Sequence, residues 1–285
     1  MPQPHRARTA ILASLSLVAA GALLAGCAQP AASDSSKQTS ASESEELNIY
    51  TVATAWRVTA AERDMLYRQG FNAAKDRLDA ALAQPSDKPL AIVSDIDDTV
   101  LSSDSYWEQL ISEGKQAFDD PMWDAWVEAN GPTATPGSVE FLEYAKSKGV
   151  EVFYVSQRDQ GERTQELGIA NLEHAGLPFA DDEHVTIQRD SSDKEAAQAE
   201  IADRYEVVVY LGDNLNDFAR KYYVEDVEER RGLAEEDAEE FGRKFILFPN
   251  PTDGHWIKAI FGDSEPEDSP EYREGFREAA EGSAN

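Results

Sequence analysis

The sequence contains little cysteine and little positive charge. Its single cysteine excludes a disulfide within the chain. Only 26 of its 285 residues are Lys or Arg, against 55 Asp and Glu, which gives a formal net charge of −29 at pH 7. Such a surface repels the backbones of nucleic acids and anionic membrane faces, so we expect no nucleic acid polymer among the partners. We expect the acidity to serve mainly solubility.

The N-terminal segment has the layout of a secretory signal. Arg6 and Arg8 precede an apolar run from Ala10 to Ala25, and no acidic residue occurs before Asp34. The run is short for a helix that spans a membrane. It ends in Leu-Ala-Gly followed by Cys27, the only cysteine. This ending is similar to the bacterial lipobox, in which cleavage precedes the cysteine and its thiol is lipidated.

The chain therefore divides into four parts. Residues 1–26 are predicted to be a lipoprotein signal peptide, and residues 27–46, which lack aromatics, a flexible tether. Residues 47–262 form the predicted folded domain, and residues 263–285 an acidic, weakly structured tail. A lipid on Cys27 would attach the exported protein to the bacterial cell membrane or envelope surface. The alternatives are an ordinary signal peptide with an incidental cysteine, or an uncleaved anchor.

Short apolar runs alternate with helix-like stretches along the domain. The predicted strands span 90–94, 150–155, 185–187, 207–211 and 245–248, and the predicted helices 53–84, 137–148, 160–175 and 193–205. This alternation predicts an α/β fold, a Rossmann-like parallel sheet with helices on both faces. The segment of about 102–135, between the first two strands, is predicted to form a smaller, mainly helical cap.

Polar side chains follow three of the predicted strands. Asp95 and Asp97 come after the first, Ser156 ends the second, and Asp213 follows the strand at 207–211. In open α/β sheets, the ligand crevice lies beyond the carboxyl ends of the strands. We therefore expect these residues to converge, although they lie far apart in the sequence.

The two carboxylates after the first strand suit phosphoryl transfer. Asp95 is a candidate nucleophile that would form an aspartyl-phosphate intermediate. Asp97, two residues on, can protonate the leaving alcohol and then activate water. In so acidic a chain, a solvated acidic turn is the alternative for this pair.

Two further groups of residues, around Ser156 and around Lys194, suit the binding of phosphate. The Ser156 hydroxyl and the backbone N–H groups around Gln157 can hold phosphoryl oxygens at a strand end. Lys194 can neutralise the nucleophile and the transferring group. Its place in a first helical turn is mildly unfavourable for a cation, which favours a functional reason. The alternatives are a helix cap for Ser156 and a surface lysine for Lys194.

Asp213 and Asp217 lie four residues apart after a strand and suit an oxygen-liking cation such as Mg²⁺. The spacing is also similar to that of a short calcium loop, but the glycine and terminal glutamate of an EF-hand are missing.

Together these four sequence motifs resemble those of the phosphatases of the haloacid dehalogenase superfamily. The order Asp-x-Asp-x-Thr, Ser, Lys, Gly-Asp-x-x-x-Asp matches its four motifs. More narrowly, the lipobox, the Phe-Tyr-Val-Ser-x-Arg segment ending at Arg158 and the Phe-Pro-Asn segment ending at Asn250 resemble class C nonspecific acid phosphatases, also called the lipoprotein 5′-nucleotidase family. The similarity extends from about Thr51 to Trp256.

The resemblance implies a Mg²⁺-dependent acid phosphatase that hydrolyses phosphomonoesters, nucleoside 5′-monophosphates among them. It implies that Asp95 is nucleophile and metal ligand, and that Asp97 is acid/base and metal ligand through its carbonyl. Asp213 would be a metal ligand and Asp217 an indirect one, while the phosphate would be bound by Ser156, Gln157 and Lys194. Candidates for an aromatic substrate pocket are Trp123, Trp126 and Tyr106, with Trp107. A place in the cap core is the alternative for these aromatic residues.

Two positions depart from the family pattern. Gln157 stands where relatives usually carry asparagine, and Asp253 where nucleotide-hydrolysing relatives carry a base-stacking tyrosine. The second departure puts a preference for nucleoside monophosphates in doubt. Phosphoryl transfer to an alcohol on the same fold, or a catalytically silent binding lipoprotein, are the alternative functions. Asp97 argues against dehalogenation, which needs no acid there.

Overall fold

The structure, a computed structural model, describes residues 48–267 and 269–282. The predicted signal peptide, the tether and the lipidation site Cys27 lie outside these residues. Within the described part of the chain, no helix has the length and apolar character needed to cross a membrane.

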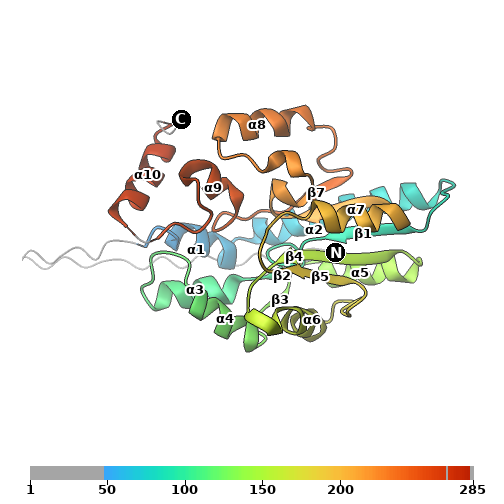
Figure 1. Ribbon diagram of the computed structural model, residues 1–285, viewed down its shortest axis with the longest axis horizontal. Coiled ribbons are helices and arrows are strands. Elements are labelled where there is room, and N and C mark those ends of the chain that lie inside the picture. Colours follow the sequence, from blue (N-terminus) through green and yellow to red (C-terminus); the bar gives the residue numbers. More distant parts are fainter. Residues whose placement is uncertain (1–47, 268, 283–285) are drawn as a thin grey trace, which may run out of the picture. The chain divides into compact units, whose positions relative to one another are not determined.

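A parallel sheet forms the centre of the described domain (Figure 1). Its strands are β1 (Leu90–Ser94), β4 (Glu151–Gln157), β5 (Val185–Gln188), β6 (Glu206–Gly212) and β7 (Phe245–Leu247). The order across the sheet is β5-β4-β1-β6-β7, and each neighbouring pair is parallel. Each of the five predicted strands is present, and the predicted α/β class is confirmed.

Helices connect the strands. They are α1 (Thr51–Thr59), α2 (Ala61–Leu82), α3 (Asp104–Ser112), α4 (Asp120–Glu128), α5 (Ser138–Ser147), α6 (Thr164–His174), α7 (Glu195–Arg204), α8 (Val227–Glu236), α9 (His255–Phe261) and α10 (Pro270–Ala280). Single 3-10 turns are η1 (Gly161–Arg163), η2 (Leu215–Asp217) and η3 (Arg220–Tyr222). A short antiparallel pair, β2 (Leu101–Ser102) with β3 (Thr133–Ala134), brackets α3 and α4.

The central strands β1, β4 and β6 are buried on both faces because helices cover each side. Helices α2 and α5 pack on one face, where Ile92 of β1 joins the main core. Helix α7 covers the other face, where Val93 of β1 and Val155 of β4 pack near Ile201. Burial on both faces explains why these strands are continuous apolar runs.

The predicted helix at 53–84 is two helices. Ala60 has an extended backbone (φ −82°, ψ 113°) that separates α1 from α2. In α2 the predicted apolar stripe is buried from Tyr67 to Leu78, but Leu82 at its end is exposed. Arg57 of α1 is buried beside the loop after β1, where it donates to Asp98.

A second core joins the cap to both ends of the domain. Trp107 of α3 and Trp126 of α4 pack in it together with Tyr50, which precedes α1, and Tyr272 of α10. The C-terminal segment therefore differs from the expected weakly structured tail, because residues 270–280 are helical and bury Tyr272.

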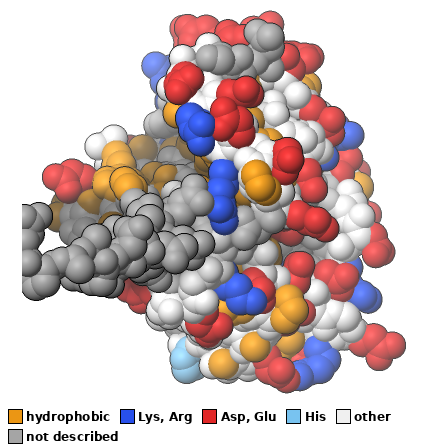
Figure 2. All heavy atoms as spheres, turned by 90° about the vertical axis from the view of Figure 1, so that its left-hand side faces the viewer, with side chains coloured by type: hydrophobic (Ala, Val, Ile, Leu, Met, Phe, Trp, Pro, Cys, Tyr) orange, Lys and Arg blue, Asp and Glu red, His pale blue; other side chains and the backbone are white. Residues whose placement is uncertain are grey.

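The surface carries the acidity predicted from composition. On the face drawn in Figure 2, Asp and Glu side chains are spread widely, with isolated Lys and Arg side chains between them. The polar residues that follow the strands are instead partly or fully buried.

Candidate active site

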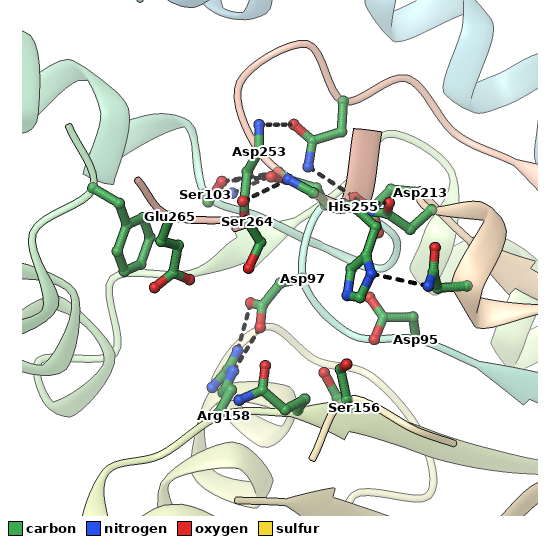
Figure 3. A pocket seen from close by; sticks show the side chains of 18 of the residues that line it. Asp95, Asp97, Ser103, Ser156, Arg158, Asp213, Asp253, His255, Ser264 and Glu265 are labelled. Carbon is green, nitrogen blue, oxygen red and sulfur yellow. Dashed lines mark hydrogen bonds and ion pairs between the residues drawn. The ribbon is translucent and has the colours of Figure 1, made fainter. Parts of the chain in front are cut away.

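The carboxyl ends of three central strands meet in one pocket. Asp95 follows β1, Ser156 lies near the end of β4, and Asp213 follows β6. Lys194, at the N-terminus of α7, enters from the segment after β5. All four line the same pocket, so the predicted convergence at this sheet edge is observed (Figure 3).

Asp95 is held in place from several sides. Its N–H donates to the carbonyl of Leu211 in β6 (2.9 Å), and its carboxylate pairs with the ammonium of Lys194. The Thr99 hydroxyl lies 3.4 Å from the second carboxylate oxygen. Asp95 is only 7% exposed, yet it lines the pocket, so a ligand there can reach its carboxylate.

Asp97 lines the same pocket and forms an ion pair with Arg158. The Arg158 Nε and Nη2 each donate to one Asp97 oxygen at 2.6 Å, a bidentate pair. Arg158 Nη1 donates to Asn171 of α6 (2.8 Å). Burial raises the pKa of the Asp97 carboxyl above its usual value, although Arg158 opposes this. The two neighbouring carboxyls, Asp95 and Asp97, therefore have different partners, as separate roles require.

Three carboxylates gather beside this pair. Oxygens of Asp95, Asp213 and Asp217 lie within 4.8 Å of one another. Burial raises the pKa of Asp217 to about 6, with Lys194 opposing and Asp95 adding to the rise. Burial, Asp217 and Asp95 raise the pKa of Asp213 well above its usual value. Lys194 is the basic partner of this group, so negative charge remains in excess.

The two carboxylates after β6 differ in what they contact. Both oxygens of Asp217 are engaged, one by Lys194 (2.7 Å) and the other by the N–H of Asn214 (2.9 Å). One Asp213 oxygen accepts from Asn250 (2.7 Å), and the other lies 3.4 Å from the Thr99 hydroxyl. Asp213 is therefore more open to a cation than Asp217, as the predicted direct and indirect roles require.

The loop after β1 is locked by a buried arginine. Asp98 has a left-handed backbone (φ 50°), which a non-glycine residue adopts at a cost of about 1 kcal/mol or more. Arg57 of α1 donates to both Asp98 oxygens and to the Thr252 hydroxyl (2.8 Å). Although burial opposes it, Arg57 holds the pKa of the Asp98 carboxyl below its usual value. This pairing fixes the turn that presents Asp97.

The remaining predicted residues divide between pocket and core. Gln157 and Trp123 line the pocket with the catalytic candidates. Tyr106 and Trp126 are not among its lining residues and lie in the second core, where the Tyr106 hydroxyl accepts from the N–H of Asp119 (2.9 Å). This placement favours the core alternative for the latter two.

Sequence reasoning assigned no role to several residues that shape the pocket. Asn250 follows β7 and supports Asp213, so the rule that placed the other strand-end residues could have found it. Arg57 gave no local signal, because its partners lie far along the chain. His255 also lines the pocket, and burial lowers the pKa of its imidazole to about 4, which keeps it neutral.

Known proteins are similar to this chain in sequence and fold. Residues 22–256 match the family described as HAD superfamily, subfamily IIIB (acid phosphatase). A class C acid phosphatase structure from Bacillus anthracis with tungstate bound is 33% identical, with a TM-score of 0.77, and the match covers 82% of this chain and 97% of that chain. A second structure of the class C enzyme from Bacillus anthracis has the same identity and coverage and a TM-score of 0.76.

The family match covers most of the chain, and the solved structures share both sequence and fold with it. These findings confirm the predicted resemblance, the fold class and the assignment as an enzyme. The chain belongs to the acid phosphatases of subfamily IIIB of the haloacid dehalogenase superfamily, and it is a phosphomonoesterase.

Proposed function

We propose that this acid phosphatase is Mg²⁺-dependent and hydrolyses phosphomonoesters through an aspartyl-phosphate at Asp95. The observation that carries the proposal is the meeting of four side chains in one pocket: Asp95 and Asp97 from the end of β1, Ser156 from the end of β4 and Lys194 from the start of α7. Asp95 and Asp97 lie two residues apart but have different partners, Lys194 and Arg158.

In the first step, an Asp95 carboxylate oxygen forms a bond to phosphorus while the bond from phosphorus to the ester oxygen breaks. Asp97 gives its proton to that oxygen, which leaves as the alcohol. The ammonium of Lys194, already beside Asp95, balances charge on the transferring group. Ser156, 2% exposed at the pocket wall, supplies a hydroxyl for a phosphoryl oxygen, and Gln157 lines the same wall.

In the second step, a water oxygen bonds to phosphorus and the bond between phosphorus and Asp95 breaks. Asp97, now a carboxylate, takes the proton of the water. The step releases inorganic phosphate and returns Asp95 and Asp97 to their starting states. One water is consumed for each ester converted to an alcohol and a phosphate.

The donor set fits a hard divalent cation. Asp95 and Asp213 offer carboxylate oxygens, the Asp97 carbonyl completes the proposed ligands, and Asp217 acts indirectly. The excess of buried carboxylates over Lys194 is the charge that such a cation would neutralise. When bound, Mg²⁺ would keep the nucleophile ionised and offset the charge that develops on the phosphoryl group.

The test is release of p-nitrophenol from p-nitrophenyl phosphate by the full chain, with Mg²⁺ and after chelation. We expect chelation to abolish activity and Mg²⁺ to restore it. Asp95→Asn should lose activity on the order of 10³-fold or more, because an amide cannot act as the nucleophile. Asp87→Asn, on an exposed turn, is the control. Undiminished turnover in Asp95→Asn would rule out the proposed nucleophile.

Nucleoside 5′-monophosphates fall within the proposed substrate class. Their rank is tested by comparing kcat/KM for nucleotides, sugar phosphates and aryl phosphates under one set of conditions. A clear preference for nucleotides would show that Asp253 does not weaken binding of the base.

We also propose that the mature protein is exported and lipid-anchored through Cys27, which lies outside the described residues. The support is the basic start, the short apolar run and the position of the only cysteine. Cys27→Ala should move the protein from the membrane fraction to the soluble fraction of bacterial cells. Retention of the variant on membranes, with the signal segment still present, would contradict lipidation.

A further inference from the structure

The pocket extends beyond the phosphate-binding residues on the side of the general acid. Asp97 separates two groups of side chains in Figure 3, with Asp95 and Ser156 on one side and Ser264 and Glu265 on the other. Since Asp97 protonates the leaving oxygen in the proposed mechanism, the leaving group must lie towards this second side. Its lining residues there decide which alcohols fit.

Asp253 and Glu265 are two carboxylates that line this side of the pocket. The Asp253 carboxylate accepts a hydrogen bond from the N–H of Gly254 (2.6 Å), and no ion pair with any described residue is found for it or for Glu265. Burial raises the pKa of Asp253 to about 6, and the charge of Asp98 adds to this rise, while the Gly254 hydrogen bond and the charge of Arg57 oppose it. Glu265 is exposed at the rim, where partial enclosure and then the charge of Asp253 raise its pKa.

The basic side chains that line the pocket already form ion pairs with carboxylates. Among the described lining residues, Lys194 and Arg158 are the only Lys and Arg, and each pairs with a carboxylate next to the reaction centre. His255 is neutral because its pKa is lowered to about 4 by burial. Above the raised pKa values of Asp253 and Glu265, the described residues on the leaving-group side therefore present negative charge and no unpaired Lys or Arg to a bound substrate.

Aromatic rings line the same pocket as these carboxylates. Phe118 and Trp123 line the pocket, are partly exposed, and have ring centroids 5.4 Å apart. Trp107, buried behind them, contributes to the same lining. Indole and phenyl faces attract organic cations, and carboxylates nearby add to this attraction. An anionic leaving group would meet repulsion from Asp253 and Glu265 instead.

We propose that Asp253, Glu265 and the rings of Phe118 and Trp123 select phosphomonoesters whose leaving alcohol carries a cationic ammonium group. The selected class is the phosphate esters of amino alcohols, in which a short chain joins the ester oxygen to the cation. The phosphate lies against Asp95 and Ser156, and the ammonium against the carboxylates and rings beyond Asp97. This inference rests on the proposed function, since it extends the same pocket.

The experiment compares two esters of nearly the same shape, phosphocholine and 3,3-dimethylbutyl phosphate, which differ in the charge of the leaving group. At pH 8, where both carboxyls are mainly ionised, with saturating Mg²⁺ and 150 mM salt, we expect kcat/KM to favour phosphocholine by about tenfold or more. Asp253→Asn and Glu265→Gln should each lower this ratio several-fold. Asp87→Asn should leave the ratio unchanged, which controls for the general loss of one negative charge.

The outcomes separate this inference from the proposed function. If both esters and p-nitrophenyl phosphate are hydrolysed but the wild-type ratio is near one, the cation selectivity is wrong and the phosphatase mechanism stands. A preference that persists in both pocket variants would equally overturn the assignment to these carboxylates. If no ester is hydrolysed by the Mg²⁺-loaded protein, the proposed function fails and this inference fails with it.

Discussion

At the scale of single residues, Arg158 fixes the orientation of the carboxyl group of Asp97, the proposed general acid. It grips both oxygens of Asp97 and is itself held by Asn171 (2.8 Å). Asn171 in turn donates to the carbonyl of Val127 in α4 (2.9 Å). The orientation of Asp97 is therefore tied to the cap through a chain of buried side chains, so changes in α4 can reach the reaction centre without contacting it.

Asp253 should destabilise the fold at neutral pH, because it is a partly buried carboxylate that forms no ion pair with any described residue. Its pKa is raised from 3.8 to about 6, so the folded state loses stability as pH rises through this range. We expect Asp253→Asn to be more stable than wild type at pH 7.5 by up to about 3 kcal/mol. This advantage should shrink as pH falls from 6 to 4.

Urea unfolding without added metal measures this difference at pH 7.5 and pH 4. The Asn side chain still offers an oxygen to the N–H of Gly254, so that hydrogen bond is matched. A variant less stable than wild type at both pH values would show that Asp253 is a structural carboxylate and contradict its unpaired state.

At the scale of elements, the last residue of β6, Gly212, lies too close to Asp217 for any side chain to fit at its position. A Cβ on Gly212 would lie 2.5 Å from the Cβ and Oδ2 of Asp217. Gly212→Ala must therefore displace Asp217 from Lys194 and Asn214. We expect a loss of Mg²⁺ affinity or activity of about 10–100-fold, since supporting groups of metal sites have effects of this size.

Mg²⁺ titration of p-nitrophenyl phosphate hydrolysis measures this effect. Gly232→Ala is the matched control, because a Cβ at Gly232 in α8 meets nothing within 4 Å. In a helix, Gly to Ala should raise stability by about 0.5–1 kcal/mol and leave activity unchanged. Equal Mg²⁺ dependence in both variants would show that Asp217 plays no part in cation binding.

The elements differ in how far the sequence predicts them. Strands such as β1 and β6 are predictable because an apolar run followed by a polar residue is a local signal, and parallel topology then brings Asp95 and Asp213 together. The start of α10 also has local signals, since Ser269 caps the N–H of Tyr272 (3.1 Å) and Pro270 follows it. Its docking depends on Tyr50, far along the chain, which local patterns do not show.

Specificity is the part of the site that the sequence predicts least. Asp253 belongs to the loop before α9, and Glu265 to a segment beyond the predicted domain boundary at 262. Only packing brings both into the pocket that Trp123 also lines. Arg57 is similar, because its hydrogen bonds reach Asp98, Asn250 and Thr252 from a helix that precedes all of the motifs. Such contacts follow from tertiary structure and carry no spacing rule.

At the scale of the whole molecule, the net charge of −29 opposes the approach of anionic substrates. Added salt screens this repulsion. With saturating Mg²⁺, we therefore expect kcat/KM for p-nitrophenyl phosphate to rise about two- to tenfold between 10 and 150 mM NaCl. A fall over the same range would mean that local cations, rather than the global charge, control substrate approach.

The most direct test of the account is chemical identification of the phosphorylated residue. Asp97→Asn should slow the hydrolytic step by about 10²–10⁴-fold, because no group then takes the proton of the water. Because p-nitrophenol is acidic enough to leave without the proton of Asp97, the intermediate still forms from p-nitrophenyl phosphate and should therefore accumulate. After acid quenching and borohydride reduction, which converts an aspartyl-phosphate to homoserine, peptide mass mapping should find homoserine at position 95. Homoserine at another aspartate, or turnover with an unmodified Asp95, would contradict the proposed mechanism.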